Sequence, residues 1–478
     1  DNVLINEQAA NSKTNTLKLG GGNDIIDLTN AGLGATYIFG EDGNDTIRVT
    51  ATELEATDLV HGGNGTDTLT IVGNFTNNLV LLDVENLILQ GTTANTTTIT
   101  SSDSPLVTTV NAVDNDEVDI ANLPAGSTVT INALSSTTAA AAKVQKIDLS
   151  FLAAEATSTI DFNTAVDLTN TTTALTTANI TSVTLDFAEI VGAAAAGLLN
   201  VTEATSLTIN SAKDIAFDDI SQGSNLLESL TVTASDKVTF EEILNNNKLA
   251  TVSISAPDDI DLGTGAKSIE NADTLTSISL VSSAGAVAIG EIGDNGATTK
   301  DPDNLATVTL TGATTVTSSI IEADILGDVT MTATTGELQT ESIVSLAGLG
   351  TVSLTATGGA IDGMANGTDT VKAADTTGIT VNLAAKTFIS DDGALVANTD
   401  HLDILNSKGD AAVNISGAAD AAVAIVAGTI NTAASSGSVS LTANNTGGIN
   451  AEVTNNEMVG DGLSTISLSA LTASIVNE

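Results

Sequence analysis

One four-residue pattern recurs along most of this chain and limits what it can fold into. A small or polar residue is followed by an apolar residue, then by Thr, Ser or another polar residue, then by a second apolar residue. Apolar residues at alternate positions predict a strand with one buried face. The pattern occupies residues 46–49, 68–71, 86–89, 128–131, 146–149, 182–185, 206–209, 229–232, 251–254, 277–280, 307–310, 328–331, 351–354, 378–381, 438–441 and 465–468.

The spacing of this pattern predicts a coil that repeats along the chain. From Val183 to Ile379, successive copies lie 21 to 30 residues apart, with weaker strand patterns between them. A period of this length with one strong strand per repeat is the signature of a solenoid. We therefore expect an all-β chain that forms an elongated parallel β-solenoid, of the β-helix or β-roll type. A Leu lies three residues before the first apolar residue in six copies, and we expect these side chains at an inward corner: Leu227, Leu249, Leu275, Leu305, Leu326 and Leu349.

A string of β-sandwich domains is the alternative architecture. Each such domain needs about seven antiparallel strands and usually has an aromatic residue in its core. Aromatic residues make up only 2% of this chain, with one Tyr and no Trp. This scarcity favours the solenoid, whose narrow interior can be filled by Val, Ile, Leu and Ala.

Three copies of a glycine-rich turn lie near the start of the sequence: GGGND at 20–24, GEDGND at 40–45 and GGNGTD at 62–67. They match the template G-G-x-G-x-D, which is typical of calcium-binding turns in parallel β-rolls. Glycine allows backbone conformations with φ > 0 that turn carbonyl oxygens toward one point, and the Asp adds a carboxylate. Such oxygen ligands suit Ca²⁺. Two copies depart from the template, with Leu19 in place of the first Gly and Glu41 in place of a second Gly.

The Asp residues of these turns are 21 and 22 residues apart, which places one turn in each coil. Stacked coils would bring the turns above one another, with Ca²⁺ between adjacent turns. The alternative is that they are ordinary Gly, Asn and Asp turns between strands. The predicted metal ligands and the glycines that shape the turns are Gly20, Gly22, Asp24, Gly40, Asp42, Gly43, Asp45, Gly62, Gly63, Gly65 and Asp67.

The charge of the chain narrows the classes of partner. Lys and Arg total 13 against 59 Asp and Glu, which gives a formal net charge of −46. Such a chain should repel nucleic acid and anionic membranes and attract divalent cations. The absence of Cys excludes disulfides and thiolate metal sites. No run of 18 apolar residues occurs, so we expect no membrane span.

Catalytic motifs are absent from the sequence, and we expect that the protein is not an enzyme. His61 and His401 have no catalytic motif beside them. Acidic clusters at 114–119, 218–219, 258–261 and 301–303 resemble paired carboxylates of glycosidases. Sugar-stacking aromatic residues and basic residues are scarce, however. The clusters are therefore predicted to be solvated turns or further Ca²⁺ sites.

Three regions follow from these patterns. Residues 1–16 are polar and are expected to form an N-terminal arm, and residues 17–90 a calcium-binding β-roll. Residues 91–478 are expected to form Thr- and Ala-rich β-solenoid repeats. A subdivision is expected near 140–200, where Ala-rich segments at 139–143 and 188–199 favour short helical insertions.

The segment GGNGTDTLTI at 62–71, followed by LDVENLIL at 82–89, resembles RTX-type calcium-binding surface-layer proteins of Gram-negative bacteria and cyanobacteria. The motif match covers residues 17–90, and beyond them the likeness is one of composition. This resemblance implies a right-handed β-solenoid, type I secretion and Ca²⁺-dependent assembly into a two-dimensional lattice. It also implies that Asp24, Asp45 and Asp67 are calcium ligands together with their neighbouring glycines. The chain departs from the family in having few copies, which lie near the start of the sequence.

The function expected from these observations is that of a secreted structural protein at the cell surface, which self-assembles through Ca²⁺ into an extracellular layer. Its expected partners are further copies of itself, and a cell-surface polysaccharide or lipopolysaccharide is a second candidate. The alternatives are a subunit of an extracellular filament or biofilm-matrix fibre, an RTX adhesin, and, less favoured, a polysaccharide-active β-helix enzyme.

Overall fold

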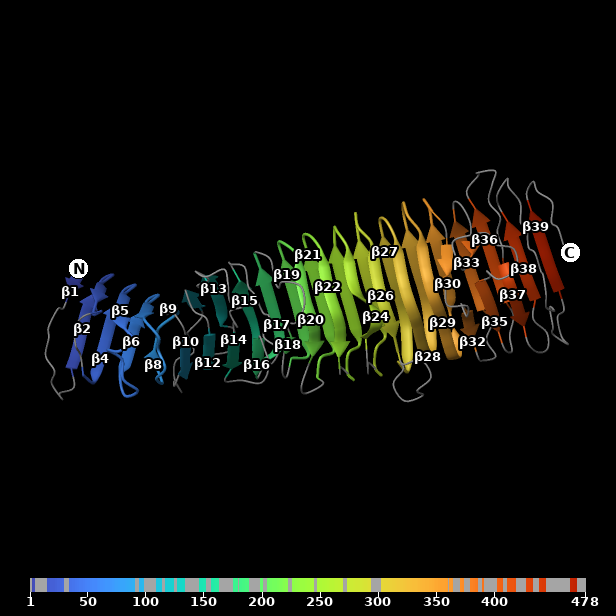
Figure 1. Cartoon of the computed structure of the whole chain (residues 1–478). Coiled ribbons are helices and arrows are strands. Elements are labelled where there is room, and N and C mark those ends of the chain that lie inside the picture. The colour runs from blue at the N-terminus through green and yellow to red at the C-terminus, as the bar shows by residue number, and fades with distance from the viewer. Residues whose placement is uncertain are drawn as a thin grey trace. The chain divides into compact units, whose positions relative to one another are not determined.

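The structure is a computed structural model. It describes residues 2–4, 15–29, 34–90, 94–98, 109–113, 117–123, 127–133, 146–151, 156–162, 175–178, 180–188, 198–200, 204–221, 226–244, 247–269, 273–293, 302–359, 361–363, 370–373, 379–385, 389–390, 402–406, 411–417, 427–432, 438–443 and 465–470. These residues form strands, turns and bends (Figure 1). None of them belongs to a helix long and apolar enough to cross a membrane.

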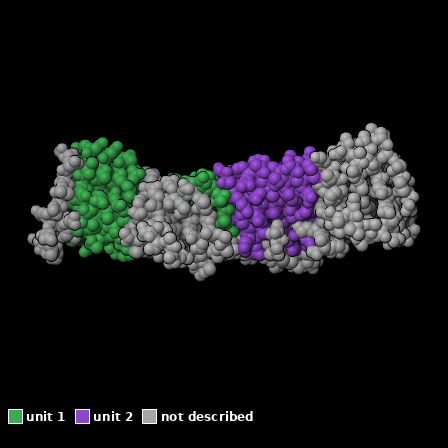
Figure 2. Space-filling view, turned by 45° about the horizontal axis from the view of Figure 1, so that its top comes forward, with its two compact units in different colours: residues 1–227 green, residues 228–478 purple. Residues whose placement is uncertain are grey.

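The chain divides into two compact units, residues 1–227 and residues 228–478 (Figure 2). The boundaries expected at residues 16 and 90 and near 140–200 stay predictions. The Ala-rich segment 139–143 lies outside the described residues, as do residues 189–197 of the second Ala-rich segment.

The first unit contains twenty strands among its described residues. They are β1 (Asn2–Leu4), β2 (Asn15–Gly21), β3 (Ile25–Asp27), β4 (Thr36–Asp42), β5 (Thr46–Thr50), β6 (Leu59–Asn64), β7 (Thr68–Val72), β8 (Val80–Leu82), β9 (Asn86–Gln90), β10 (Ala94–Thr98), β11 (Thr109–Val113), β12 (Glu117–Leu123), β13 (Thr128–Ala133), β14 (Lys146–Phe151), β15 (Ala156–Phe162), β16 (Leu175–Ala178), β17 (Ile180–Phe187), β18 (Leu198–Asn200), β19 (Ser206–Ser211) and β20 (Ile215–Ser221).

These strands pair in parallel with strands of the neighbouring coils, which confirms the predicted β-solenoid. One ladder runs through the odd-numbered strands from β1 to β19. Strands β2, β4, β6 and β8 form a separate four-stranded sheet, and the even-numbered strands from β10 to β20 form a further ladder. Figure 1 shows this succession of strands along the unit.

Apolar side chains stack in columns between these ladders. Ile47, Leu69 and Leu87 are register partners on β5, β7 and β9, and all three are buried. Each such side chain contributes about 1.5–3 kcal/mol when it is fully removed from water. The few aromatic residues also stack, since the ring centroids of Phe162 and Phe187 lie 4.5 Å apart.

The second unit contains nineteen strands among its described residues. They are β21 (Ser229–Ala234), β22 (Val238–Leu244), β23 (Thr251–Ala256), β24 (Ile260–Ile269), β25 (Ser277–Ser282), β26 (Val287–Ile292), β27 (Asn304–Gly312), β28 (Val316–Ala333), β29 (Leu338–Leu349), β30 (Thr351–Ala356), β31 (Ile361–Gly363), β32 (Thr370–Ala373), β33 (Ile379–Ala385), β34 (Ile389–Ser390), β35 (Leu402–Asn406), β36 (Ala411–Gly417), β37 (Ala427–Thr432), β38 (Ser438–Ala443) and β39 (Thr465–Ala470).

The second unit has three parallel ladders. The first joins β21, β23, β25, β27, β28, β30, β33, β36, β38 and β39. The second joins β22, β24, β26, β28, β29, β31 and β34. The third joins β29, β32, β35 and β37. The 18-residue strand β28 pairs with β26 near its start and with β30 near its end, so a single strand spans two faces of one coil.

The inward position predicted for six leucines is confirmed, while their place at a corner stays a prediction. The six leucines that precede the strong strands are all buried, at 5% exposure or less. Leu305, Leu326 and Leu349 are register partners in three successive coils. The apolar residues of all sixteen sequence patterns also lie in strands. The copy at 146–149 falls on β14, in the ladder of even-numbered strands, however, and not on the odd-numbered ladder that carries the other copies of the first unit.

Candidate metal centre

The three glycine-rich turns lie above one another in successive coils. Gly20 is the register partner of Glu41, and Glu41 that of Gly63. All three residues have left-handed backbones, with φ of 100°, 76° and 107°. Glycine adopts such a φ without strain, whereas Glu41 bears a cost for its Cβ. The departure from the template at Glu41 therefore leaves the shape of the turn unchanged.

A second glycine position requires both a left-handed backbone and close contact between coils. Gly22, Gly43 and Gly65 have φ of 114°, 132° and 145°. The carbonyl oxygen of Gly22 lies where a Cβ on Gly43 would stand, and the carbonyl oxygen of Gly43 lies in the same way against Gly65. Only glycine fits here, because any side chain would displace the neighbouring main chain.

The Asp side chains of the turns connect successive coils. The main-chain N–H of Asp24 donates to Oδ1 of Asp45 at 2.8 Å, and the N–H of Asp45 donates to Oδ1 of Asp67 at 2.7 Å. Asp45 is 1% exposed and Asp67 is fully buried. Each carboxylate therefore satisfies the main chain of the preceding coil with one of its two oxygens.

The other oxygen of each carboxylate has no partner. Oδ2 of Asp45 and Oδ2 of Asp67 are buried and accept no hydrogen bond from the protein. A buried polar atom without a partner is costly, and an ionised one more so. Burial raises the pKa of both carboxyls, in spite of the main-chain hydrogen bonds that they accept. These two atoms need a positively charged or donating ligand.

Each unpartnered oxygen packs closely against a glycine, at a position where a Cβ would not fit. A Cβ on Gly40 would collide with Oδ2 of Asp45 and with the carbonyl oxygen of Gly62. A Cβ on Gly62 would collide with Oδ2 of Asp67 and with the carbonyl oxygen of Asp83. We call these two positions, where the absence of a Cβ permits the close approach, the Gly40 gap and the Gly62 gap. Each one brings a carboxylate oxygen and a main-chain carbonyl oxygen from two coils to one place.

These donors fit a hard cation. Within the described part of the chain, no three His, Asp or Glu side chains converge on one point, so a cage built of side chains alone is absent there. Ca²⁺ accepts main-chain carbonyl oxygens together with carboxylates. Asp45 and the Gly62 carbonyl would hold it at the Gly40 gap, and Asp67 with the Asp83 carbonyl at the Gly62 gap. A bound cation would also offset the charge of each buried carboxylate.

The remaining predicted residues take different places in the turns. Asp24 is buried, and its main-chain N–H donates the hydrogen bond to Oδ1 of Asp45 described above. Asp42 is exposed, and its Oδ1 accepts a hydrogen bond of 2.8 Å from Nδ2 of Asn64. In the first turn, Leu19 stands at the position of Gly40, so its side chain begins where the Gly40 gap lies one coil later.

Two groups of residues in the turns were missed by sequence reasoning. Asn23 and Asn44 form their own connection, because Oδ1 of Asn23 accepts from the Asn44 N–H at 2.8 Å and Oδ1 of Asn44 from the Thr66 N–H at 3.0 Å. The Asn before the Asp in two of the three copies was the available signal. Glu85 was also missed, and its Oε2 accepts from the Asp67 N–H at 2.7 Å.

The four-stranded sheet carries two basic residues beside the turns, Lys18 on β2 and His61 on β6. Nε2 of His61 lies 3.1 Å from Oδ2 of Asp83, and Nζ of Lys18 lies 3.1 Å from Oε1 of Glu41. His61 was expected to be a neighbour of the third turn, and it lies on β6 directly before that turn. His401 lies outside the described residues.

The acidic clusters give mixed outcomes. Oδ1 of Asp259 accepts a hydrogen bond of 2.7 Å from the Ala286 N–H, so this carboxylate holds the turn of the next coil. Asp218 and Asp219 lie on β20. Residues 114–116 and Asp301 lie outside the described residues. Their part in calcium binding stays a prediction.

Comparison of the sequence with models of known protein families, with curated proteins and with solved structures finds no match.

Proposed function

We propose that this chain is a secreted structural protein of the RTX type, which binds Ca²⁺ at its glycine-rich turns and self-assembles into an extracellular surface layer. The observation that carries the proposal is the pair of buried carboxylate oxygens, Oδ2 of Asp45 and Oδ2 of Asp67, each of which lies with a main-chain carbonyl oxygen close against a glycine. Ordinary turns between strands do not require an unpartnered buried charge.

The charge of the chain supports a role for calcium in assembly. At a net charge of −46, neighbouring copies repel one another, and bound divalent cations reduce this repulsion. Calcium that binds only the folded chain also stabilises it, by about 2.7 kcal/mol per site when free calcium is at a hundredfold excess over Kd.

The outer face of the first ladder in the second unit gives assembly an uncharged surface. The outward positions of β21, β23, β25 and β27 carry hydroxyl residues and one Val: Ser229, Thr231, Thr233, Thr251, Ser253, Ser255, Ser277, Ser279, Val281, Thr307, Thr309 and Thr311. Neighbouring hydroxyls bond along the columns, as between Thr251 and Ser229 at 3.1 Å. Two copies can meet at such a face without burying like charges.

Electron microscopy of the purified chain tests this proposal. Samples would be imaged in millimolar Ca²⁺ and again after chelation. Sheets that dissolve on chelation are expected for a surface layer. Calcium-dependent fibres would instead show that the protein is the subunit of a filament. A monomer under both conditions would contradict calcium-dependent self-assembly and favour an adhesin.

A further inference from the structure

The four-stranded sheet of the first unit has apolar residues on both of its faces. On β4, Ile38 is buried, whereas Tyr37 and Phe39 on either side of it are not. Successive side chains of a strand point to opposite faces of the sheet, so Tyr37 and Phe39 lie on the outer face. The register between strands places the outer residues in two columns, which together we call the Tyr37 face: Thr16, Tyr37, Leu59 and Val80, and Lys18, Phe39, His61 and Leu82.

The two aromatic residues of this face occupy an unusual place for this chain. Tyr37 is 38% exposed, and Phe39 is half-buried. Five other phenylalanines lie in the core at 4% exposure or less: Phe75, Phe162, Phe187, Phe217 and Phe240. Rings on an outer face add nothing to the packing of the core, and a continuous exposed apolar patch marks an interaction site. The Tyr37 face is therefore a surface for a partner.

Basic groups flank the Phe39 ring on two neighbouring strands. Nζ of Lys18 lies 5.7 Å from the centroid of this ring, and the centroid of the His61 ring lies 5.8 Å from it. Each basic group also has a carboxylate beside it, Glu41 for Lys18 and Asp83 for His61. One edge of the Tyr37 face thus offers both hydrogen-bond donors and acceptors. Aromatic and basic residues, whose scarcity argued against a polysaccharide-active enzyme, come together here.

The size of the Tyr37 face limits what can bind it. Four strands at a spacing of about 4.8 Å and two columns about 7 Å apart give an area of roughly 250 Å². A stable protein–protein interface buries about 800 Å² on each partner, so this face alone would not hold a second copy of the chain. A narrow ligand that lies across the strands fits the area better.

Charge restricts the ligand further. The chain has a formal net charge of −46, which repels an anionic partner. Both basic groups of the face are offset by the carboxylates beside them. A neutral ligand that has apolar faces and many hydroxyl groups matches this combination of rings and polar groups. Chains of β-linked hexoses have this chemistry, because their rings present C–H groups on their faces and hydroxyls at their edges.

We propose that the Tyr37 face binds a neutral, β-linked polysaccharide, with sugar rings stacked on Tyr37 and Phe39. The charged groups at the edge of the face bond the sugar hydroxyls. This binding surface goes beyond the structural role proposed above, and none of its steps depends on calcium.

Native electrophoresis of the full chain through gels that contain a neutral polysaccharide tests this inference. Hydroxyethylcellulose, barley β-glucan and galactomannan are the three probes, and chelator is present so that calcium-dependent assembly does not retard the chain. We expect at least one probe to retard the wild type. Tyr37→Ala should weaken the binding by about tenfold or more, because it removes the exposed ring. Ile25→Ala is the matched control and should bind as the wild type does, since Ile25 is an exposed apolar residue of the other ladder.

Tyr37→Leu distinguishes sugar stacking from a general apolar contact. Leu keeps an apolar side chain but has no ring, so this variant should lose as much binding as Tyr37→Ala. A wild type that no probe retards would overturn the inference, as would equal retardation of the wild type and Tyr37→Ala. A dimer in analytical ultracentrifugation that Tyr37→Ala abolishes, without retardation by any probe, would replace the polysaccharide by a second copy. Because the gels contain chelator, none of these results bears on calcium binding at the turns.

Discussion

The main-chain N–H of Asp24 donates to Oδ1 of Asp45 at 2.8 Å, while Oδ2 of the same Asp45 carboxylate is buried without a partner. One oxygen thus holds two coils together, and the other keeps an unbalanced charge. This division of roles links the fold of the turns to their proposed chemistry. It also means that a substitution at Asp45 should have opposite effects with and without calcium.

Asp45→Asn tests that reversal. Because burial raises the pKa of Asp45, its ionised form costs stability at pH 7, and this cost disappears as the pH falls through the raised pKa. Asn keeps an oxygen for the Asp24 N–H and removes the charge. We expect Asp45→Asn to melt at a higher temperature than the wild type in chelator.

In saturating calcium the order should reverse. The variant loses one site, worth about 2.7 kcal/mol at a hundredfold excess of calcium over Kd. Thermal melts followed by circular dichroism at pH 7, in chelator and in saturating calcium, measure the melting temperatures of the variant and the wild type. The account is contradicted if the variant melts below the wild type in both conditions and by the same number of degrees. That result would show that Asp45 has only a structural role.

Gly65→Ala tests the close contact between turns. Its backbone has φ of 145°, and the Gly43 carbonyl lies where the new Cβ would stand. A left-handed backbone alone costs a non-glycine residue about 1–2 kcal/mol, and the displaced carbonyl adds to this. We expect a clear loss of stability in urea melts even without calcium. Gly21→Ala has open space at its Cβ, so its stability should stay within about 0.5 kcal/mol of the wild type. Equal stability of the two variants would contradict the stacking of the turns.

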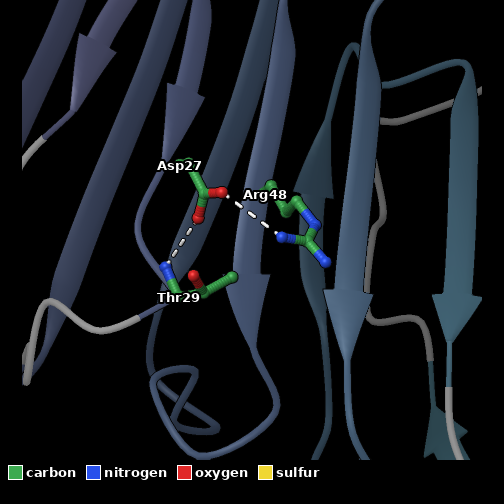
Figure 3. Close-up of polar contacts among 3 residues, drawn as sticks. All are labelled: Asp27, Thr29 and Arg48. Carbon is green, nitrogen blue, oxygen red and sulfur yellow. Dashed lines mark hydrogen bonds and ion pairs between the residues drawn. The ribbon is translucent and has the colours of Figure 1, made fainter.

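Asp27 and Arg48 provide a test of charge outside the metal centre. Oδ1 of Asp27 accepts from the Thr29 N–H at 3.0 Å, and Oδ2 lies 3.3 Å from a guanidinium nitrogen of Arg48 (Figure 3). The hydrogen bonds from Thr29, and then Arg48, lower the pKa of the Asp27 carboxyl. A lowered pKa contributes stability above the unfolded-state pKa, and that stability is lost as the pH falls through the folded-state pKa.

We therefore expect Asp27→Asn to reduce the free energy of unfolding at pH 7, by less than about 1 kcal/mol because the pair is solvent-exposed. The difference from the wild type should shrink toward zero near pH 2. Urea melts of both proteins across this pH range measure it. A difference that is the same at both ends of the range would show that the charge of Asp27 is not its cause.

Much of the fold could be predicted from the sequence because the burial pattern is local. Alternating apolar residues and a Leu three residues before them were enough to place the strong strands and the inward leucines. Five strands of the same ladders, β1, β3, β11, β15 and β36, were not found from the pattern. Strands β11, β15 and β36 have Asn111, Asp161 and Asn414 at the polar position of the pattern, so the sequence carried the same signal there.

The candidate site could be predicted only in part, because its geometry depends on which residues of different coils come together. The repeated Asp and Gly positions were visible in the sequence. The role of Glu85 could not be predicted from the sequence. It depends on the register between the three-residue turn 83–85 and the six-residue turn 62–67 of the preceding coil. The unequal roles of the two oxygens of Asp45 also require the stacked structure.

A crystal structure grown in millimolar calcium would test the central claim most directly. We predict a cation at the Gly40 gap, about 2.3–2.6 Å from Oδ2 of Asp45 and from the carbonyl oxygen of Gly62. Anomalous scattering would identify it as calcium. Turns stacked as described here, with Oδ2 of Asp45 hydrogen-bonded to a water and no cation beside it, would contradict the account.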